Sequence, residues 1–234
     1  MTTTRRGKPL RIDIHTHIIP RNYPDFNKKF NSARYLTTTH LENNTAEMNI
    51  DGSVFRVITC NCWDHTERLR EMLSSQSEDV VHVQVISTIP VLFNYNAPAL
   101  ECLEICMFLN DDIAATVAKA PKKFIGLATL PLQDPNLSVG ELERCVNVLG
   151  YRGIQIGSHV NEWNLDARQL DPLWKVRIRF NVEMRGVGCR RVHTSMGYGP
   201  NRENVEILVS MVNRNGGSFF ANLSPARPQS QYAH

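Results

Sequence analysis

The chain has 234 residues and a formal net charge of +3, with 42% hydrophobic and 21% charged residues. This length supports one domain with a sizeable core, and the composition excludes disordered and fibrous proteins. No run approaches the roughly 18 apolar residues of a membrane span, and no apolar segment typical of a secretory signal follows the first arginines, so we expect a cytosolic protein without a membrane partner.

The first expected strand, LRIDIH at residues 10–15, alternates in polarity and leads directly into a pair of histidines, His15 and His17. Because residues i and i+2 of a strand point to the same face, both imidazoles can turn toward one ion. Two histidines at this spacing are also common as solvated or hydrogen-bonded loop residues. The pair alone therefore leaves metal binding open.

An insertion is expected between about residues 20 and 63, where the pattern is short and polar. The stretch IDGSVFRVITCNCW predicts a turn at Asp51-Gly52 followed by an extended segment. Such a flap over one end of a sheet or barrel is a common place for substrate contacts.

Strands and amphipathic helices alternate through the rest of the first 174 residues. Gly150 is favourable just past the end of the last helix. This alternation predicts right-handed βαβ units, a parallel sheet and the α/β class. The expected strands cover residues 81–88, 123–132 and 152–160, and the expected helices cover residues 66–75, 99–120 and 136–149.

The composition changes near residue 172. Residues 172–234 contain nine Lys+Arg, eight of them arginine, but only three Asp+Glu and no aspartate. Basic and aromatic residues do not interleave there as they do in a nucleic-acid groove, so we expect no nucleic-acid partner. We interpret residues 175–234 as a divergent, arginine-rich tail, disordered at least at its end. An altered reading frame, a mis-joined exon, a wrong gene model or a real variant with a replaced C-terminus would each produce it.

The six cysteines show neither CxxC pairs nor the density of a disulfide scaffold. We expect buried free thiols at Cys60, Cys62, Cys102, Cys106, Cys145 and Cys189.

Several stretches carry a resemblance that is more specific than the pattern of elements: IDIHTHIIPRNYPDF, GSVFRVITCNCWD, VQVISTIPVLFNY and GIQIGSHVNEW. Through them the chain resembles the 2-amino-3-carboxymuconate-6-semialdehyde decarboxylase family of the metal-dependent amidohydrolase superfamily. The resemblance runs almost continuously from about Leu10 to Trp174. The FRV…NCWD and GIQIGSHVNEW stretches favour this family over other members of the superfamily.

The resemblance implies a (β/α)8 TIM barrel of which residues 1–174 supply about the first four βα units. It implies one zinc ion on the C-terminal face, held by the HxH pair, a histidine of an HPWD-like motif and a late aspartate, with a further histidine as base. The implied reaction is decarboxylation of 2-amino-3-carboxymuconate 6-semialdehyde to 2-aminomuconate 6-semialdehyde, in the kynurenine route of tryptophan breakdown. This carboxy-lyase reaction limits quinolinate formation, and the intact enzymes are expected to be cytosolic homodimers.

Three residues match functional positions of the family. His15 and His17 match the first two zinc ligands, and Arg56 matches a flap arginine that receives a substrate carboxylate, for which a planar guanidinium is well suited. From the residues alone, Arg56 could equally be a solvated strand residue. The family often has an arginine and a glutamate where this chain has Thr59 and Cys60, which would alter the polarity of the pocket.

The remaining candidates have weaker contexts. Asp13 could orient a histidine or make a local cap, and His159 could contact the metal ligands or the substrate from the end of its strand. His40, His65 and His82 are interpreted as ordinary surface or core histidines. His193 lies in about the right region for a third ligand but lacks the Pro-Trp-Asp setting.

Beyond Trp174 we find no HPWD-like motif and no family base histidine. Since a catalytic zinc site has three protein ligands and only two are matched, we expect the chain as written to be inactive, with an open parallel edge beyond the strand at 152–160. Two alternatives remain: a non-catalytic variant that docks with and modulates the full-length enzyme, and a hydrolase of the same superfamily.

Overall fold

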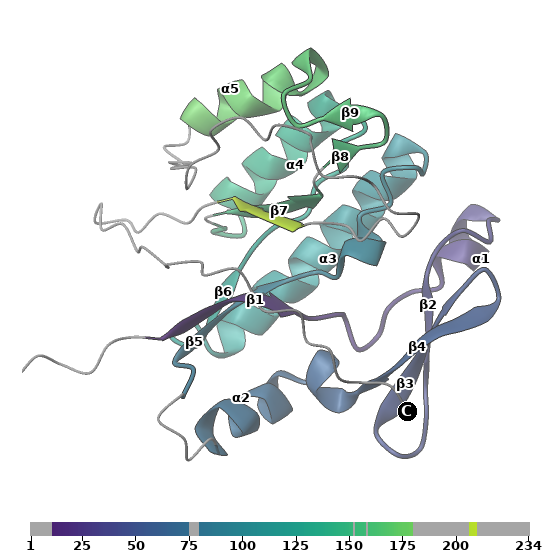
Figure 1. The fold of residues 1–234 in the computed structure, drawn as a ribbon, viewed down its shortest axis with the longest axis vertical. Helices are drawn as coiled ribbons and strands as arrows, with labels where there is room; N and C mark the ends of the chain where they lie inside the picture. The colour runs from purple at the N-terminus through teal and green to yellow at the C-terminus, as the bar shows by residue number, and fades with distance from the viewer. Residues whose placement is uncertain (1–10, 75–79, 152, 158, 180–205, 210–234) are drawn as a thin grey trace, which may run out of the picture.

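The computed structural model describes residues 11–74, 80–151, 153–157, 159–179 and 206–209. Its centre is a parallel sheet in the order β1 (Ile12–His17), β5 (Val83–Ser87) and β6 (Phe124–Gly126), shown in Figure 1. β7 (Ile154–Gly157) follows through a parallel bridge between Ala128 and Ile154. The α/β class is confirmed. Closure into a barrel stays a prediction, because the described strands form an open sheet.

Helices connect the parallel strands as expected. They are α2 (His65–Ser74), α3 (Ala99–Lys119) and α4 (Pro135–Asn147), followed by α5 (Asp171–Arg179). α3 contacts β6, α4 contacts α3, and α5 contacts α4, so α3, α4 and α5 form one packed layer, whereas α2 lies apart from it beside the turn that follows the flap. The Asp134 carboxylate caps α4 by accepting the N–H groups of Asn136 and Leu137. Gly150 has a φ of 75°, as the helix-ending role requires.

Two predicted strands have different extents in the structure. The expected strand at 123–132 is regular only over Phe124–Gly126. Beyond it, Leu127 still donates to the Ile86 carbonyl of β5, and Ala128 donates to the Gly153 carbonyl beside β7. The expected strand at 152–160 divides into β7 and the short β8 (His159–Val160), which pairs with β9 (Trp163–Asn164). Local periodicity could not show these changes of partner.

The sequence predicts an open edge at β7, and this prediction is wrong. β10 (Glu206–Val209) pairs antiparallel with β7, so a segment of the tail takes the edge position that a fifth parallel strand would take in a complete barrel. An extended edge exposes unpaired backbone groups that any extended segment can satisfy. The prediction of disorder for the rest of residues 175–234 falls largely outside the described residues.

The flap consists of three antiparallel strands in the order β2 (Thr37–His40), β3 (Thr45–Ile50) and β4 (Ser53–Thr59). Asp51 and Gly52 both have positive φ, which confirms the predicted turn between β3 and β4. The short helix α1 (Phe26–Phe30) precedes the flap strands, and three 3-10 turns complete the described elements (Cys60–Cys62, Pro90–Leu92 and Arg168–Leu170).

Two hydrophobic clusters form the core. The sheet core includes Ile86, Phe124 and Ile156, whereas the flap core includes Phe26, Tyr35 and Met48. α3 belongs to both, because Cys102, Ile105, Cys106 and Leu109 of its first half lie in the flap core and Ile113 lies in the sheet core. The cysteines among the described residues are free, and Cys102, Cys106 and Cys145 are buried as expected. The expectation of burial was wrong for Cys60 and Cys62, which are half-buried in the turn after β4, and Cys189 lies outside the described residues. Within the described part, no helix has the length and apolar character needed to cross a bilayer.

Candidate functional site

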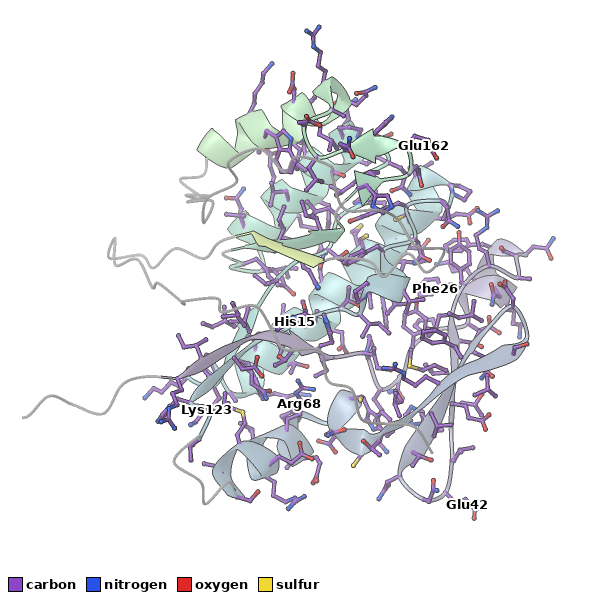
Figure 2. All side chains as sticks on the ribbon, viewed as in Figure 1. His15, Phe26, Glu42, Arg68, Lys123 and Glu162 are labelled. Atoms are coloured by element: carbon purple, nitrogen blue, oxygen red, sulfur yellow. The ribbon has the colours of Figure 1, made fainter. Side chains whose placement is uncertain are left out.

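His15 and His17 lie at the C-terminal end of β1, where the chain leaves the sheet. Figure 2 labels His15 on this strand. Their ring centroids are 5.3 Å apart and their planes are nearly perpendicular, at 87°. His15 is exposed and His17 is half-buried. The structure brings the two predicted ligands together at the strand end, where parallel α/β folds place their chemistry.

His17 is held through its ring. Ser87 is the residue of β5 that pairs with His17 of β1, and its hydroxyl contacts the His17 Nδ1 at 3.2 Å. The same hydroxyl donates to the Thr16 carbonyl at 3.2 Å. Sequence reasoning missed Ser87, since a serine within an apolar strand carries no signal that it faces a histidine 70 residues away.

His17 is also held through its backbone. Arg68 of α2 is buried between α2 and β1, and its Nη1 donates to the His17 carbonyl at 2.9 Å and to the Asn61 carbonyl at 2.8 Å. Its Nε donates to the Gln84 side chain. Burial lowers the pKa of Arg68 below its usual value, but a guanidinium remains charged in proteins. Arg68 therefore joins the end of β1 to the end of the flap.

The flap returns to the sheet beside the histidines. The Ile19 N–H donates to the Cys62 carbonyl at 3.0 Å, just after the last flap strand. Burial raises the pKa of the Cys62 thiol, against the opposing effects of the Arg68 charge, a backbone hydrogen bond with Thr59 and the Arg56 charge. Arg56 itself is exposed in the middle of β4, opposite Met48. Its contact with a substrate stays a prediction.

The Asp13 carboxylate forms a hydrogen bond with the nearby backbone, as in one of the two roles considered for it, and not with a histidine ring. The carboxylate accepts the His15 backbone N–H at 3.1 Å, two residues along the strand. This bond coincides with an irregularity between Asp13 and Thr16 in the pairing of β1 with β5. The irregularity is the kind of bulge that redirects side chains near functional sites.

His159 lies beyond the C-terminal end of β7, and the histidine pair lies at the C-terminal end of β1, so both are at the same end of the parallel strands. In an open sheet, the three strand spacings from β1 to β7 amount to a distance of roughly 14 Å. A role near the metal would require a curved, closed barrel and stays a prediction.

The other histidines have ordinary surroundings where they are described. The His82 Nδ1 accepts the Arg11 N–H, and the His40 Nε2 contacts the Arg21 carbonyl. His65 begins α2, and His193 lies outside the described residues.

A divalent metal suits the donor chemistry of the pair, since imidazole nitrogen is a ligand for zinc and other transition metals. Within the described residues no group of three or more His, Cys, Asp or Glu side chains is arranged to hold an ion. The described part therefore brings together the two predicted ligands without a third side chain of these types placed to bind the same ion.

Comparisons with known proteins identify the family to which the chain belongs. The family model described as Amidohydrolase matches residues 12–183. The chain is 44% identical over 168 residues to the 2-amino-3-carboxymuconate-6-semialdehyde decarboxylase of Dictyostelium discoideum, covering 72% of this chain and 46% of that protein. It is 34% identical over 196 residues to the Caenorhabditis elegans protein of the same name, covering 75% and 48%.

Among solved structures, the chain is similar to a 5-carboxyvanillate decarboxylase from Novosphingobium aromaticivorans, complexed with manganese and 4-hydroxy-3-methoxy-5-nitrobenzoic acid. The TM-score is 0.54 and the identity 21%, covering 73% of this chain and 48% of that one. A likeness at this identity shows the fold. From its sequence, this chain belongs to the amidohydrolase family, and it spans about half the length of the curated relatives it matches.

Proposed function

We propose that residues 11–179 carry the metal-binding and substrate-binding half of a zinc-dependent decarboxylase acting on 2-amino-3-carboxymuconate 6-semialdehyde. The observation that carries the proposal is the histidine pair at the end of β1, with the flap anchored beside it through Arg68. The 44% identity to the Dictyostelium decarboxylase supports the choice of substrate.

His15 and His17 would hold the zinc ion through ring nitrogens. A divalent ion at this place supplies Lewis acidity that stabilises negative charge developing on the substrate. The chain's own residues contribute positioning: the Ser87 hydroxyl and the Arg68 guanidinium hold His17 at its ring and its carbonyl.

Arg56 would bind a carboxylate of the substrate. A guanidinium presents paired donors that match a carboxylate, and the exposed position of Arg56 on β4 leaves it accessible from solvent. The substrate would therefore lie between the flap and the end of β1.

Zinc content tests the metal part of this proposal. We expect the purified 234-residue chain to retain zinc weakly after dialysis, and the double variant His15→Ala/His17→Ala to retain markedly less, as measured by elemental analysis. The matched control is His65→Ala, which removes an imidazole from the start of α2. Equal zinc content in the wild type and the double variant would contradict the assignment.

Turnover tests the reaction. Because only two ligands are assigned and a catalytic zinc site has three from the protein, we expect no measurable CO2 release from 2-amino-3-carboxymuconate 6-semialdehyde by the 234-residue chain. A chimera joining residues 1–174 to the remaining half of the Dictyostelium relative should show zinc-dependent turnover. Clear CO2 release by the 234-residue chain alone would show that the tail supplies ligands, with His193 the first to substitute.

A further inference from the structure

We infer that Ser87 is a positioning residue that fixes the tautomer of His17, so that the metal is bound through the His17 Nε2. The inference rests on the proposed metal site and concerns a residue outside it. Its basis is the pair of contacts made by one hydroxyl, 3.2 Å to the Thr16 carbonyl and 3.2 Å to the His17 Nδ1.

The proton count decides the direction of both bonds. A serine hydroxyl has one proton, and a carbonyl oxygen can only accept, so the bond to Thr16 uses that proton. The Ser87 oxygen must then accept from the His17 Nδ1, which therefore carries hydrogen. In a neutral imidazole the lone pair for a metal is then on Nε2.

The backbone keeps the two groups in this relation. His17 and Ser87 are register partners in the pairing of β1 with β5, and the Ile18 N–H donates to the Ser87 carbonyl at 2.9 Å. Arg68 holds the His17 carbonyl from the other side. Since Ser87 is only 4% exposed, water does not readily replace its hydroxyl. The hydroxyl and the ring are thus arranged before a metal binds.

A partner of this kind restricts both ring orientation and the identity of the ligating nitrogen. Removing the partner of a ligating histidine typically costs 10-fold to 100-fold in metal affinity. We therefore expect Ser87→Ala to raise the zinc dissociation constant about 10-fold to 100-fold. Ser87→Thr retains a hydroxyl and should recover most of that loss.

The first measurement is the tautomer of His17 in the metal-free wild type, from nitrogen-15 chemical shifts of its ring. We expect protonated Nδ1, and an increased fraction of the other tautomer in Ser87→Ala. Thr16→Val is the matched control, because it removes another buried hydroxyl between the same strands, one that bonds the Val85 carbonyl instead of a histidine. Thr16→Val should leave the His17 tautomer unchanged.

The second measurement is zinc titration of these three proteins and of Ser87→Thr by calorimetry with zinc alone. A wild-type His17 protonated at Nε2 overturns the inference whether or not any variant folds. Unchanged tautomer and unchanged affinity in a folded Ser87→Ala overturn it as well, and leave the proposed metal site intact if His15→Ala/His17→Ala still loses zinc. A Ser87-dependent Nδ1–H in a chain that binds no zinc would support the role of Ser87 and reject the proposed function.

Discussion

The parallel sheet and the flap differ in how they use their strands. In the sheet, β5 and β7 are largely buried, and their side chains pack into the sheet core. In the flap, β4 exposes six of its seven residues, including Val54, Phe55 and Val57, each 54% exposed. The flap core instead relies on α1, β3, α3 and the residues just before β2. β5 and β7 are thus held inside a packed core, whereas the flap is a thin sheet with one strand largely exposed to solvent.

The two regions nevertheless share α3 and are joined at Arg68. This arrangement suits a site in which the sheet holds the metal ligands and the flap presents Arg56. It also raises the question of whether the two cores unfold separately or together.

Removing one aromatic side chain from each core gives the largest expected effect. Phe26→Ala in the flap core and Phe124→Ala in the sheet core should each cost about 3–5 kcal/mol of unfolding free energy, because both rings are almost fully buried. Hydrogen exchange should show faster opening of β2–β4 in the first variant and of β5–β6 in the second. Identical exchange patterns in the two variants would show that the two cores unfold as one cooperative unit.

Arg56→Ala should have the next largest effect, and it should weaken substrate turnover without weakening metal binding. In the chimera described above we expect kcat/KM to fall by an amount equal to about 2–5 kcal/mol of transition-state stabilisation, as when one partner of a desolvated charge pair is lost. Zinc content should not change. Arg70→Ala is the control, because Arg70 is an exposed arginine paired with Glu67. An unchanged kcat/KM would show that Arg56 of the flap does not bind the substrate.

Asn110→Ala should have a smaller effect confined to the sheet region. The Asn110 side chain accepts the Thr129 N–H and donates to the Thr129 carbonyl and to Glu141, joining α3 to α4 and to the chain after β6. Leaving these buried groups without a partner should cost about 1–3 kcal/mol, measured by urea unfolding. Asn147→Ala, at an exposed helix position, should change stability by less than about 0.5 kcal/mol. Loosening of the flap in Asn110→Ala would show that α3 transmits the change.

Much of the fold followed from local pattern. The helix expected at 99–120 is observed at Ala99–Lys119, because its apolar residues recur at helical spacing. The strand expected at 81–88 is observed at Val83–Ser87, because it is a near-continuous β-branched run. The strand extents after residues 123 and 152 were wrong, because they depend on which neighbour accepts each N–H group. The pairing of β10 with β7 joins segments about 50 residues apart, and no short-range signal indicates it.

The sequence by itself determined the α/β class, the turn of the flap and the placement of His15 and His17 together at a strand end, because all three depend on residues close in the chain. Only the tertiary structure decided that Ser87 faces the His17 ring, that Arg68 joins β1 to the flap, and that Arg56 lies on an exposed strand. The physical reason is that a hydrogen bond between residues 51 or 70 apart depends on strand register and helix packing, which arise from the whole fold and leave no periodic trace in the sequence.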